Sequence, residues 1–388
     1  MTRWFNPTLI HLSSSTWINT TSRFKPLYKP VKHYRIIKEL AKGSTGTIYL
    51  AINVYTKKYY AIKEIHQSKL QKQHGMDLLQ ARHPKYRQQQ QQQHKEEHDK
   101  ENGVQKRRKL IDSTMPIHSP LLSHWSESEI LKMFNQHQHI IQWIDAFEED
   151  GHVYLVMESI KDTSILMDIN SNSDNNQVSS FDESLYHSIF VQLVNTLEYV
   201  HEKNIIHGDI KPENILITKE KKIKLIDFGS AIQFNNDEEK DQKKNKKNQK
   251  NNMISQPRGT PAFAAPEILI PTILQVSSSN EMKKKEEDQE PMTLKEKMTA
   301  LDIWSLGMTL YCMIYGSLPF HSTQSQFQLC QTLKSIHEIP LPKTSPSTKK
   351  DINPQLLDLL SKMLKINPLE RIPLHLIQSH PWFLQHEV

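Results

Sequence analysis

The chain has little cysteine and no long apolar run. Its two cysteines, Cys312 and Cys330, do not form a C-x-x-C pair, which excludes a disulfide framework and a zinc finger and fits a reducing compartment. The most apolar stretch, Trp304 to Tyr315, is shorter than the roughly 20 residues that a transmembrane helix needs. We therefore expect no transmembrane helix and no membrane partner. Glycine is scarce too, with only 10 in 388 residues, so the places where it occurs are informative.

A strong excess of charge of one sign is also lacking. The chain has 49 Lys and Arg against 43 Asp and Glu residues, a net charge of +6. The excess lies in short runs at 106–109 and 240–250, and acidic residues flank both. We interpret these runs as solvated loops or a weak nuclear-import signal, and we expect no nucleic-acid partner. A cytoplasmic protein, with a nuclear location as the alternative, fits this composition.

Several segments have a composition that cannot bury enough apolar surface to fold. Residues 1–33 contain no acidic residue and loosely resemble a mitochondrial transit peptide, although we interpret them as a disordered basic arm. Low-complexity insertions are expected at 67–122, 235–256 and 273–298. What remains is long enough to bury one large core, which predicts a single domain over 34–384.

The foldable sequence is strand-rich in its first half and helix-rich in its second. Runs of β-branched and aromatic residues predict strands beginning near Tyr34, Gly46, Lys57 and His152. Ser126 predicts the N-cap of a helix from Glu127 onward. Apolar residues at helical spacing from Leu185 to Val200, and a nearly all-apolar stretch from Ala300, predict two buried helices. The expected fold class is α+β.

Two glycines in AKGSTGTIYLA, residues 41–51, would let backbone N–H groups approach phosphate oxygens. Ala41 stands where a G-x-G-x-x-G motif has its first glycine, so a plain hairpin turn explains Gly43 and Gly46 about as well. A dinucleotide-binding fold with Glu64 as its ribose acid is a further alternative, but it requires a helix after Gly46. The β-branched run at that place predicts two strands bridged by the glycines.

Lys63 lies in the strand motif YAIKEI. A cation on a strand beside a phosphate loop can hold ligand phosphates, but a half-buried cation needs a carboxylate partner. Glu127, or alternatively Glu129, supplies such a carboxylate on the helix after the first insertion. Taken alone, the motif is also compatible with a solvent-facing lysine.

The motif IIHGDIKPENILI, residues 205–217, is the most informative in the chain. Its polar loop carries a carboxylate on Asp209, a cation on Lys211 and an amide on Asn214. Transfer of a phosphoryl group to an alcohol requires a base or hydroxyl-orienting group, a charge clamp and a metal ligand. In IKLIDFGSA, Asp227 ends an apolar strand 18 residues after Asp209, where a carboxylate can bind Mg²⁺. The alternative for the loop at 205–217 is an ordinary turn built on Pro212, without a catalytic role.

From about Tyr34 to Phe383, insertions excepted, the chain resembles a eukaryotic protein kinase of the Ser/Thr type. The residues that match the invariant catalytic set in order are Lys63, Glu127, Asp209, Asn214 and Asp227. DIKPEN is similar to the serine/threonine branch. Three further segments, YYAIKEIHQSKLQKQHGM, GTPAFAAPE and ALDIWSLGMTLYCMIYGSLPF, resemble the calcium/calmodulin-dependent protein kinase kinases and the related fungal kinases that activate the AMP-activated kinase.

The resemblance implies a two-lobed kinase fold, with a small β-rich lobe over about 34–157 and a larger helical lobe over about 158–384. It also implies ATP and Mg²⁺ as cofactors. Asp209 would orient and deprotonate a Ser or Thr hydroxyl of a protein substrate, Lys211 would offset phosphoryl charge, and Lys63, held by Glu127, would grip the α- and β-phosphates. The residues implied to contact the nucleotide are Ala41, Gly43, Gly46, Ile48, Lys63, Met157, Glu158, Ile160, Asn214 and Asp227, the last two through Mg²⁺.

The resemblance has further implications for supporting residues and substrate. Thr260 would lie in the substrate-facing loop, and Asp302 would support the catalytic loop from a buried helix. Arg371 would pair with Glu267. The implied substrate is a threonine in the activation loop of a downstream kinase, such as the AMP-activated kinase.

Two departures from the family pattern affect regulation. Gly208 stands where most kinases carry an arginine that meets a phosphorylated activation loop, so we expect activity largely independent of that phosphorylation. Calmodulin-dependent relatives carry their calmodulin-binding helix beyond the catalytic domain, whereas this sequence closes on HPWFLQHEV, so we expect no calmodulin partner. The alternative function is a pseudokinase-type scaffold. Ala41 and Gly208 favour it, and the presence of Lys63, Asp209 and Asp227 argues against it.

Overall fold

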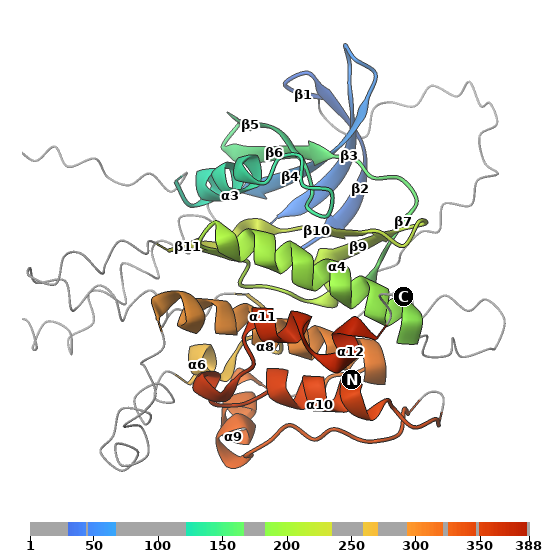
Figure 1. The fold of residues 1–388 in the computed structure, drawn as a ribbon. Coiled ribbons are helices and arrows are strands. Elements are labelled where there is room, and N and C mark those ends of the chain that lie inside the picture. Colours follow the sequence, from blue (N-terminus) through green and yellow to red (C-terminus); the bar gives the residue numbers. More distant parts are fainter. Residues whose placement is uncertain are drawn as a thin grey trace, which may run out of the picture. The chain divides into compact units, whose positions relative to one another are not determined.

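The structure is a computed structural model that describes most of the predicted foldable sequence. The described residues are 30–43, 46–66, 122–166, 183–234, 259–270, 293–320, 325–346 and 349–385. Residues 1–29 and nearly all of the three predicted insertions lie outside them. The chain divides into two compact units, coloured by sequence in Figure 1. Unit 1 comprises Met1–Glu129 and Trp143–Ser159, and unit 2 comprises Ile130–Gln142 and Ile160–Val388.

Unit 1 is built on a six-stranded sheet whose neighbouring strands are all antiparallel. In spatial order the strands are β1 (Pro30–Val31), β2 (Tyr34–Lys42), β3 (Thr47–Asn53), β4 (Tyr59–His66), β6 (His152–Glu158) and β5 (Trp143–Glu149). Side chains that alternate along these strands form an apolar cluster that includes Tyr34, Ala51, Ile62 and Val156. The strands predicted from their β-branched runs are therefore confirmed.

Unit 2 is mainly helical. Its helices are α4 (Glu183–Glu202), α6 (Pro266–Leu269), α8 (Leu294–Tyr315), α9 (Gln326–Ser335), α10 (Pro354–Met363), α11 (Leu374–Gln378) and α12 (Pro381–Leu384). Two small antiparallel sheets accompany them, one of β10 (Ile223–Leu225), β9 (Ile215–Thr218) and β7 (Thr163–Ile165), the other of β11 (Ile232–Gln233) and β8 (Ile205–Ile206). Helix α3 (Leu122–Met133) runs from unit 1 into unit 2.

Helical periodicity explains how unit 2 builds its core. Of the apolar positions predicted to share one face of α4, Ile189 and Leu193 are fully buried, whereas Leu185 is half-buried. Helix α8 is buried almost all round from Ala300 to Tyr315, as its continuous apolar sequence predicts. The α+β class is confirmed by these two units.

The unit boundaries differ from the predicted lobe boundaries. Residues 130–142 belong to unit 2, and the second boundary lies at Ser159 rather than at residue 157. Backbone pairing holds the 130–142 segment there, because Leu225 N–H donates to the His139 carbonyl at 2.8 Å and Ile141 N–H donates to the Leu225 carbonyl at 3.0 Å. These hydrogen bonds join residues more than 80 positions apart, and no local sequence pattern predicts them.

Three element ends also differ from the predictions. Helix α3 begins at Leu122, so Ser126 lies inside the helix rather than capping it. Helix α8 begins at Leu294, inside the predicted insertion 273–298, because Thr293 and Glu296 form a capping box. Strand β1 lies in the predicted arm 1–33, where Lys32 donates from its backbone to Glu149 at 2.7 Å.

The sequence analysis also predicted that the chain has no disulfide framework and no transmembrane helix. Both cysteines are free thiols. No helix within the described ranges combines the length and hydropathy that crossing a membrane would require.

Candidate active site

The register of the unit 1 sheet places Lys63 in the middle of β4. Lys63 lies opposite Ile48 of β3 on one side and opposite Leu155 of β6 on the other. Although β4 is a central strand whose side chains point to the faces of the sheet, Lys63 is only 3% exposed, so its side chain is shielded from water. The alternative of a solvent-facing lysine is therefore wrong.

Burial of an ammonium group requires a partner, and Glu127 of α3 supplies it. Lys63 Nζ donates to both carboxylate oxygens of Glu127 at 3.0 Å, and Glu127 is 2% exposed. The alternative partner Glu129 is exposed. Breaking a buried pair of this kind leaves an uncompensated charge, which makes the pair an obligate unit rather than a surface ion pair.

The two glycines of AKGSTGTIYLA lie between β2 and β3. Gly43 N–H donates to the Gly46 carbonyl at 2.9 Å, and Ala41 pairs with Ile48 across the strands. A Cβ on Gly46 would overlap the backbone carbonyl oxygen of Glu64, so only glycine fits there. A strand follows Gly46, not a helix, which excludes the dinucleotide-binding alternative.

Three residues predicted to contact the nucleotide lie at the end of β6 and just after it. Met157 is buried in β6 and pairs with Ala61, and Glu158 ends the strand opposite Tyr60. Ile160 lies after the boundary, in unit 2. Their role in nucleotide contact stays a prediction.

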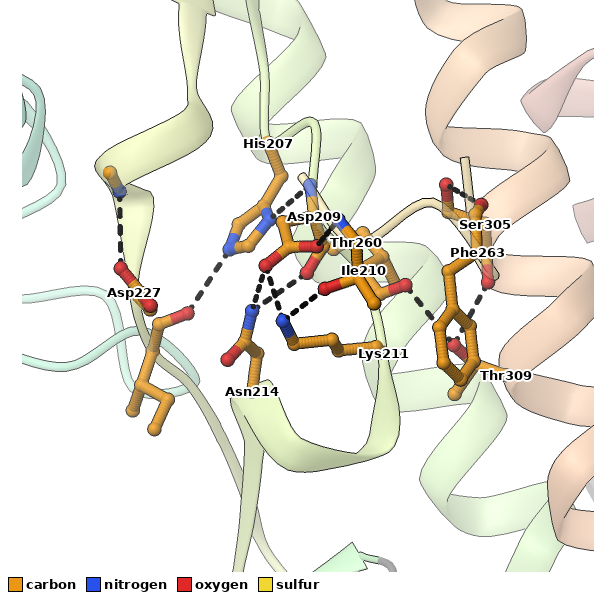
Figure 2. Close-up of polar contacts among 12 residues, drawn as sticks. His207, Asp209, Ile210, Lys211, Asn214, Asp227, Thr260, Phe263, Ser305 and Thr309 are labelled. Atoms are coloured by element: carbon orange, nitrogen blue, oxygen red, sulfur yellow. Dashed lines mark hydrogen bonds and ion pairs between the residues drawn. The ribbon is translucent and has the colours of Figure 1, made fainter. Parts of the chain in front are cut away.

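In unit 2, strand β8 and the short 3₁₀ helix η2 (Pro212–Asn214) frame the loop that carries Asp209. The Asp209 carboxylate accepts three hydrogen bonds: from Thr260 N–H to Oδ1 at 2.7 Å, and to Oδ2 from Lys211 Nζ at 2.6 Å and Asn214 Nδ2 at 3.0 Å. Figure 2 shows the side chains of Asp209, Lys211 and Asn214 pointing toward one another, with Asp227 lying apart from them at the left of the view. Proline at the start of η2 suits this tight turn, because its fixed φ matches the helix and its missing N–H is not needed there.

Asp302 of α8 holds the loop that carries Asp209 through hydrogen bonds to the backbone of that loop. Its carboxylate is fully buried and accepts the backbone N–H groups of His207 at 2.8 Å and Gly208 at 2.9 Å. His201 Nε2 bonds the same carboxylate at 2.8 Å. Burial raises the pKa of Asp302, but the hydrogen bond from His201 and the other donors outweigh burial, so the pKa lies below its usual value. The predicted supporting role of Asp302 fits this geometry.

His207 is a positioning group that the sequence reasoning missed. Its Nδ1 accepts Asp209 N–H at 3.3 Å, so its Nε2 carries the proton and donates to the Ile226 carbonyl at 3.1 Å. Burial lowers the pKa of His207, which keeps the ring neutral and preserves this arrangement. The ring also packs edge-on against Phe228, with centroids 4.6 Å apart.

Asp227 lies at the start of η3 (Phe228–Ser230). Its backbone is left-handed, with φ of 61°, and its Oδ1 accepts Gly229 N–H at 3.3 Å. Buried Phe228 packs on Phe134, with ring centroids 5.2 Å apart, and fixes the turn. A backbone bond of 2.9 Å from Ile226 N–H to the Asn214 carbonyl joins this segment to the catalytic loop.

The donor set of Asn214 and Asp227 fits Mg²⁺. Both offer oxygen, the ligand atom that this hard cation prefers, and Mg²⁺ usually takes only one or two protein ligands with phosphates and water. Asn214 Nδ2 donates to the Asp209 backbone and side chain, which directs its amide oxygen away from Asp209. Among the described residues, no group of three or more His, Cys, Asp or Glu side chains is arranged to hold a metal. A two-ligand site that depends on nucleotide phosphates is compatible with that finding.

Thr260 has a more direct place than the sequence reasoning assigned to it. Besides its backbone bond to Asp209, its hydroxyl accepts a hydrogen bond from Lys211 Nζ. Thr260 thus joins the catalytic loop instead of only facing a substrate. Thr260 and Asp209 lie 51 positions apart, on either side of a predicted insertion. In the sequence, only the GT dipeptide of GTPAFAAPE indicates their contact.

Comparison with known proteins adds the family. A family model described as "Protein kinase domain" matches residues 96–383, well over half of the chain. The chain belongs to the protein kinase family. The matched region begins after β4, so the place of Lys63 in the kinase rests on the sheet register and on its pair with Glu127.

Curated relatives of this kinase belong to the serine/threonine type. A probable serine/threonine-protein kinase of Dictyostelium discoideum is 28% identical over 93% of this chain and 39% of its own length. The calcium/calmodulin-dependent protein kinase kinase of Caenorhabditis elegans is 28% identical over 92% and 53%. SNF1-activating kinase 1 of Saccharomyces cerevisiae is 27% identical over 96% and 31%. These findings confirm the resemblance, and the kinase spans about half or less of the length of these relatives.

Proposed function

We propose that this chain transfers the γ-phosphoryl group of ATP to Ser or Thr hydroxyls of a protein substrate. The observation that supports this most is the Asp209 carboxylate, held by Thr260, Lys211 and Asn214. Three donors fix its orientation, as a group that must meet a substrate hydroxyl requires.

In the proposed reaction, the hydroxyl oxygen of the substrate attacks the γ-phosphorus of ATP. A new O–P bond forms as the bond to the β–γ bridging oxygen breaks, and ADP leaves with the electron pair of that bond. The proton of the hydroxyl passes to Asp209. The ammonium of Lys211, 2.6 Å from Asp209, stabilises the negative charge on the phosphoryl oxygens.

The ammonium group of Lys63 would hold the α- and β-phosphates. The bidentate contact with Glu127 fixes the ammonium, so little side-chain freedom is lost when ATP binds. Asn214 and Asp227 would hold Mg²⁺, which neutralises phosphate charge and orients the γ-phosphoryl group when bound.

We propose an activation-loop threonine of an AMP-activated-kinase-like enzyme as the substrate. Support comes from the similarity to SNF1-activating kinase 1, whose name says that it activates SNF1, and to calcium/calmodulin-dependent protein kinase kinase, whose name says that it acts on a protein kinase. The catalytic residues of this chain contribute nothing to that choice, because Asp209 and Lys211 act on any hydroxyl that reaches them.

The test uses the purified chain with Mg-ATP labelled in the γ-phosphate. Substrates are a catalytically dead AMP-activated kinase subunit, the same subunit with its activation-loop threonine changed to alanine, and a set of generic Ser/Thr peptides. Labelling that depends on the threonine supports both proposals, and labelling of the peptides alone rejects the substrate class. ATP binding without any transfer would favour the pseudokinase scaffold.

We also propose that transfer does not depend on activation-loop phosphorylation. Gly208 offers no cation to a phosphate, and its backbone is held by Asp302 instead. Phosphatase treatment of the purified chain should therefore leave its turnover within about twofold of that of the untreated protein, since no charge-assisted contact is lost there. Loss of turnover on dephosphorylation, restored by rephosphorylation, would refute this point.

A further inference from the structure

Two histidines of unit 1 lie opposite each other where β4 ends and β6 begins. His66 is the last residue of β4 and pairs with His152, the first residue of β6, and the register between these strands has no shift. Directly opposite residues of an antiparallel pair project from the same face of the sheet, so the two imidazoles are neighbours. Their ring centroids are 4.6 Å apart, and the ring planes are inclined by 76°.

This separation suits two ligands of one metal ion. A bond from a metal ion to imidazole nitrogen is about 2.0–2.1 Å long, so two imidazoles on one ion, at tetrahedral or tetragonal angles, have ring centroids about 4.5–5 Å apart. The distance of 4.6 Å between His66 and His152 lies in that range. Aligning a nitrogen of each ring with the ion needs rotation about χ2, which is broad for histidine and which the exposed His66 side chain allows.

A hydrogen bond determines which nitrogen His152 offers. Its Nδ1 lies 3.0 Å from the carbonyl oxygen of Asp150. Because a carbonyl oxygen only accepts, Nδ1 carries the proton of the neutral ring, and Nε2 carries the lone pair that a metal ion binds. Metal-binding histidines almost always donate their other N–H to a carboxylate, a backbone carbonyl or water in this way. The Asp150 carbonyl therefore orients His152 as a ligand, and this observation is independent of the ring spacing.

The histidine pair lies on the face of the sheet opposite Lys63. Side chains alternate along β4, so Lys63 projects from one face, and Glu64 and His66 project from the other. Tyr154 lies on the same face as His66, since its hydroxyl donates to Glu64 at 2.9 Å. A metal ion bound by the two histidines would therefore leave the contact between Lys63 and Glu127 in place.

Water completes the coordination that the two histidines begin. Glu149 of β5 lies opposite His152 on the other side of β6, but its Oε2 accepts the backbone N–H of Lys32 at 2.7 Å. Within the described ranges, no third side chain of the metal-binding types joins such a pair. Imidazole nitrogen suits Zn²⁺, Cu²⁺ and Ni²⁺, whereas Mg²⁺ and Ca²⁺ prefer oxygen ligands. The donor set thus selects transition-metal ions.

We propose that His66 and His152 form a binding site for a divalent transition-metal ion such as Zn²⁺, which links the end of β4 to the start of β6. Each histidine binds the ion through one ring nitrogen, and water fills the remaining positions. The site uses none of the residues assigned to Mg²⁺, Asn214 and Asp227. It is also independent of the proposed kinase activity, so either proposal can fail without the other.

The test is chemical modification of histidines in the full chain by diethyl pyrocarbonate, mapped by mass spectrometry. The reagent attacks the lone pair of an imidazole nitrogen, and a bound metal ion blocks that lone pair. Zinc at about ten times its dissociation constant fills about nine tenths of the sites, so modification of His66 and of His152 should each slow by about 10-fold. Exposed His375 of α11 is the internal control and should react at an unchanged rate. Mg²⁺ at the same concentration should protect neither member of the pair.

Variants distinguish one shared site from two independent ones. In His66→Gln, Zn²⁺ should no longer protect His152, and in His152→Gln it should no longer protect His66, because a single imidazole binds zinc weakly. His375→Gln is the matched control and should leave both protections intact. Circular dichroism checks that each variant is folded. Three results would each overturn the inference: no protection in the wild-type chain, equal slowing at His375, or protection of His152 that persists in His66→Gln.

Thermal unfolding gives a second measurement. A ligand that binds only the folded chain stabilises it, so Zn²⁺ at about 100 times its dissociation constant should raise the melting temperature of the wild type by about 5–10 °C. His66→Gln should lose that shift, and the double variant His66→Gln/His152→Gln should lose no more than the single one. A shift that is unchanged in the double variant would contradict the proposed link between β4 and β6.

Discussion

The buried pair of Arg371 and Glu267 allows a quantitative test of how unit 2 is stabilised. The Arg371 guanidinium donates to both Glu267 oxygens, at 2.8 and 3.0 Å, and both side chains are almost completely buried. It also donates to the carbonyls of Ala300 at 2.6 Å and Lys365 at 3.1 Å, and its Cζ atom lies 5.2 Å from the ring centroid of Trp304. We consider Arg371→Met, which keeps an unbranched apolar side chain and removes every donor.

The expected loss follows from what the substitution leaves behind. Glu267 stays buried as an unpaired carboxylate, and removal of one partner of such a pair costs about 3–5 kcal/mol of unfolding free energy. For a domain of this size, each kcal/mol corresponds to about 2–4 °C, so the melting temperature should fall by about 6–20 °C. The double variant Glu267→Leu/Arg371→Met leaves no buried charge and should recover most of the loss.

Thermal unfolding followed by circular dichroism measures these changes. The control is Glu338→Gln, which removes an exposed ion pair with Lys365 and should leave the melting temperature unchanged. Our reasoning is refuted if Arg371→Met melts within 2 °C of the control, or if the double variant is as unstable as the single one.

Three further predictions follow from buried groups. Lys63→Met should reduce phosphoryl transfer by more than about 100-fold in a labelled-ATP assay while the far-ultraviolet spectrum is retained; transfer near the wild-type rate would contradict the role of Lys63. Burial lowers the pKa of His207 from 6.5, so the unfolded chain binds more protons below that pH and the unfolding free energy should decrease as the pH falls below 6.5. His207→Phe should weaken that dependence in denaturant titrations, and an unchanged slope would argue against it. Burial raises the pKa of Cys312 to about 12, so iodoacetamide at pH 8 should modify half-buried Cys330 first, and mass spectrometry showing the reverse would contradict the structure.

The catalytic loop shows which parts of the site can be predicted from local sequence. Asp209, Lys211 and Asn214 lie within six residues, so their spacing alone predicts that they share a turn, and the structure places Asn214 within 3.0 Å of Asp209. The position of Asp227 also follows from the pattern, because the apolar strand β10 ends two residues before it. Such short-range features are fixed by chain geometry and by the contrast between apolar and polar residues.

Long-range contacts did not follow from the same patterns. The hydrogen bond from Thr260 to Asp209 follows the left-handed backbone of Gly259. Hydrophobic periodicity in the sequence cannot predict such a backbone angle. The transfer of residues 130–142 to unit 2 depends on bonds to Leu225, which a hydrophobic pattern cannot specify. The early start of α8 could have been predicted from Thr293 and Glu296, which form a capping box. The sequence analysis missed it because these residues lie within a highly charged run.

The most direct test of the central claim is a single-turnover comparison of the wild-type chain with Asp209→Asn, at saturating Mg-ATP and a Ser/Thr peptide or protein substrate. The substitution preserves shape and removes the charge that accepts the proton. We predict that wild type transfers label to hydroxyl residues, whereas Asp209→Asn binds ATP with similar affinity and transfers at least 100-fold more slowly. Transfer by Asp209→Asn at a rate near that of wild type would contradict the claim that Asp209 accepts the proton in phosphoryl transfer.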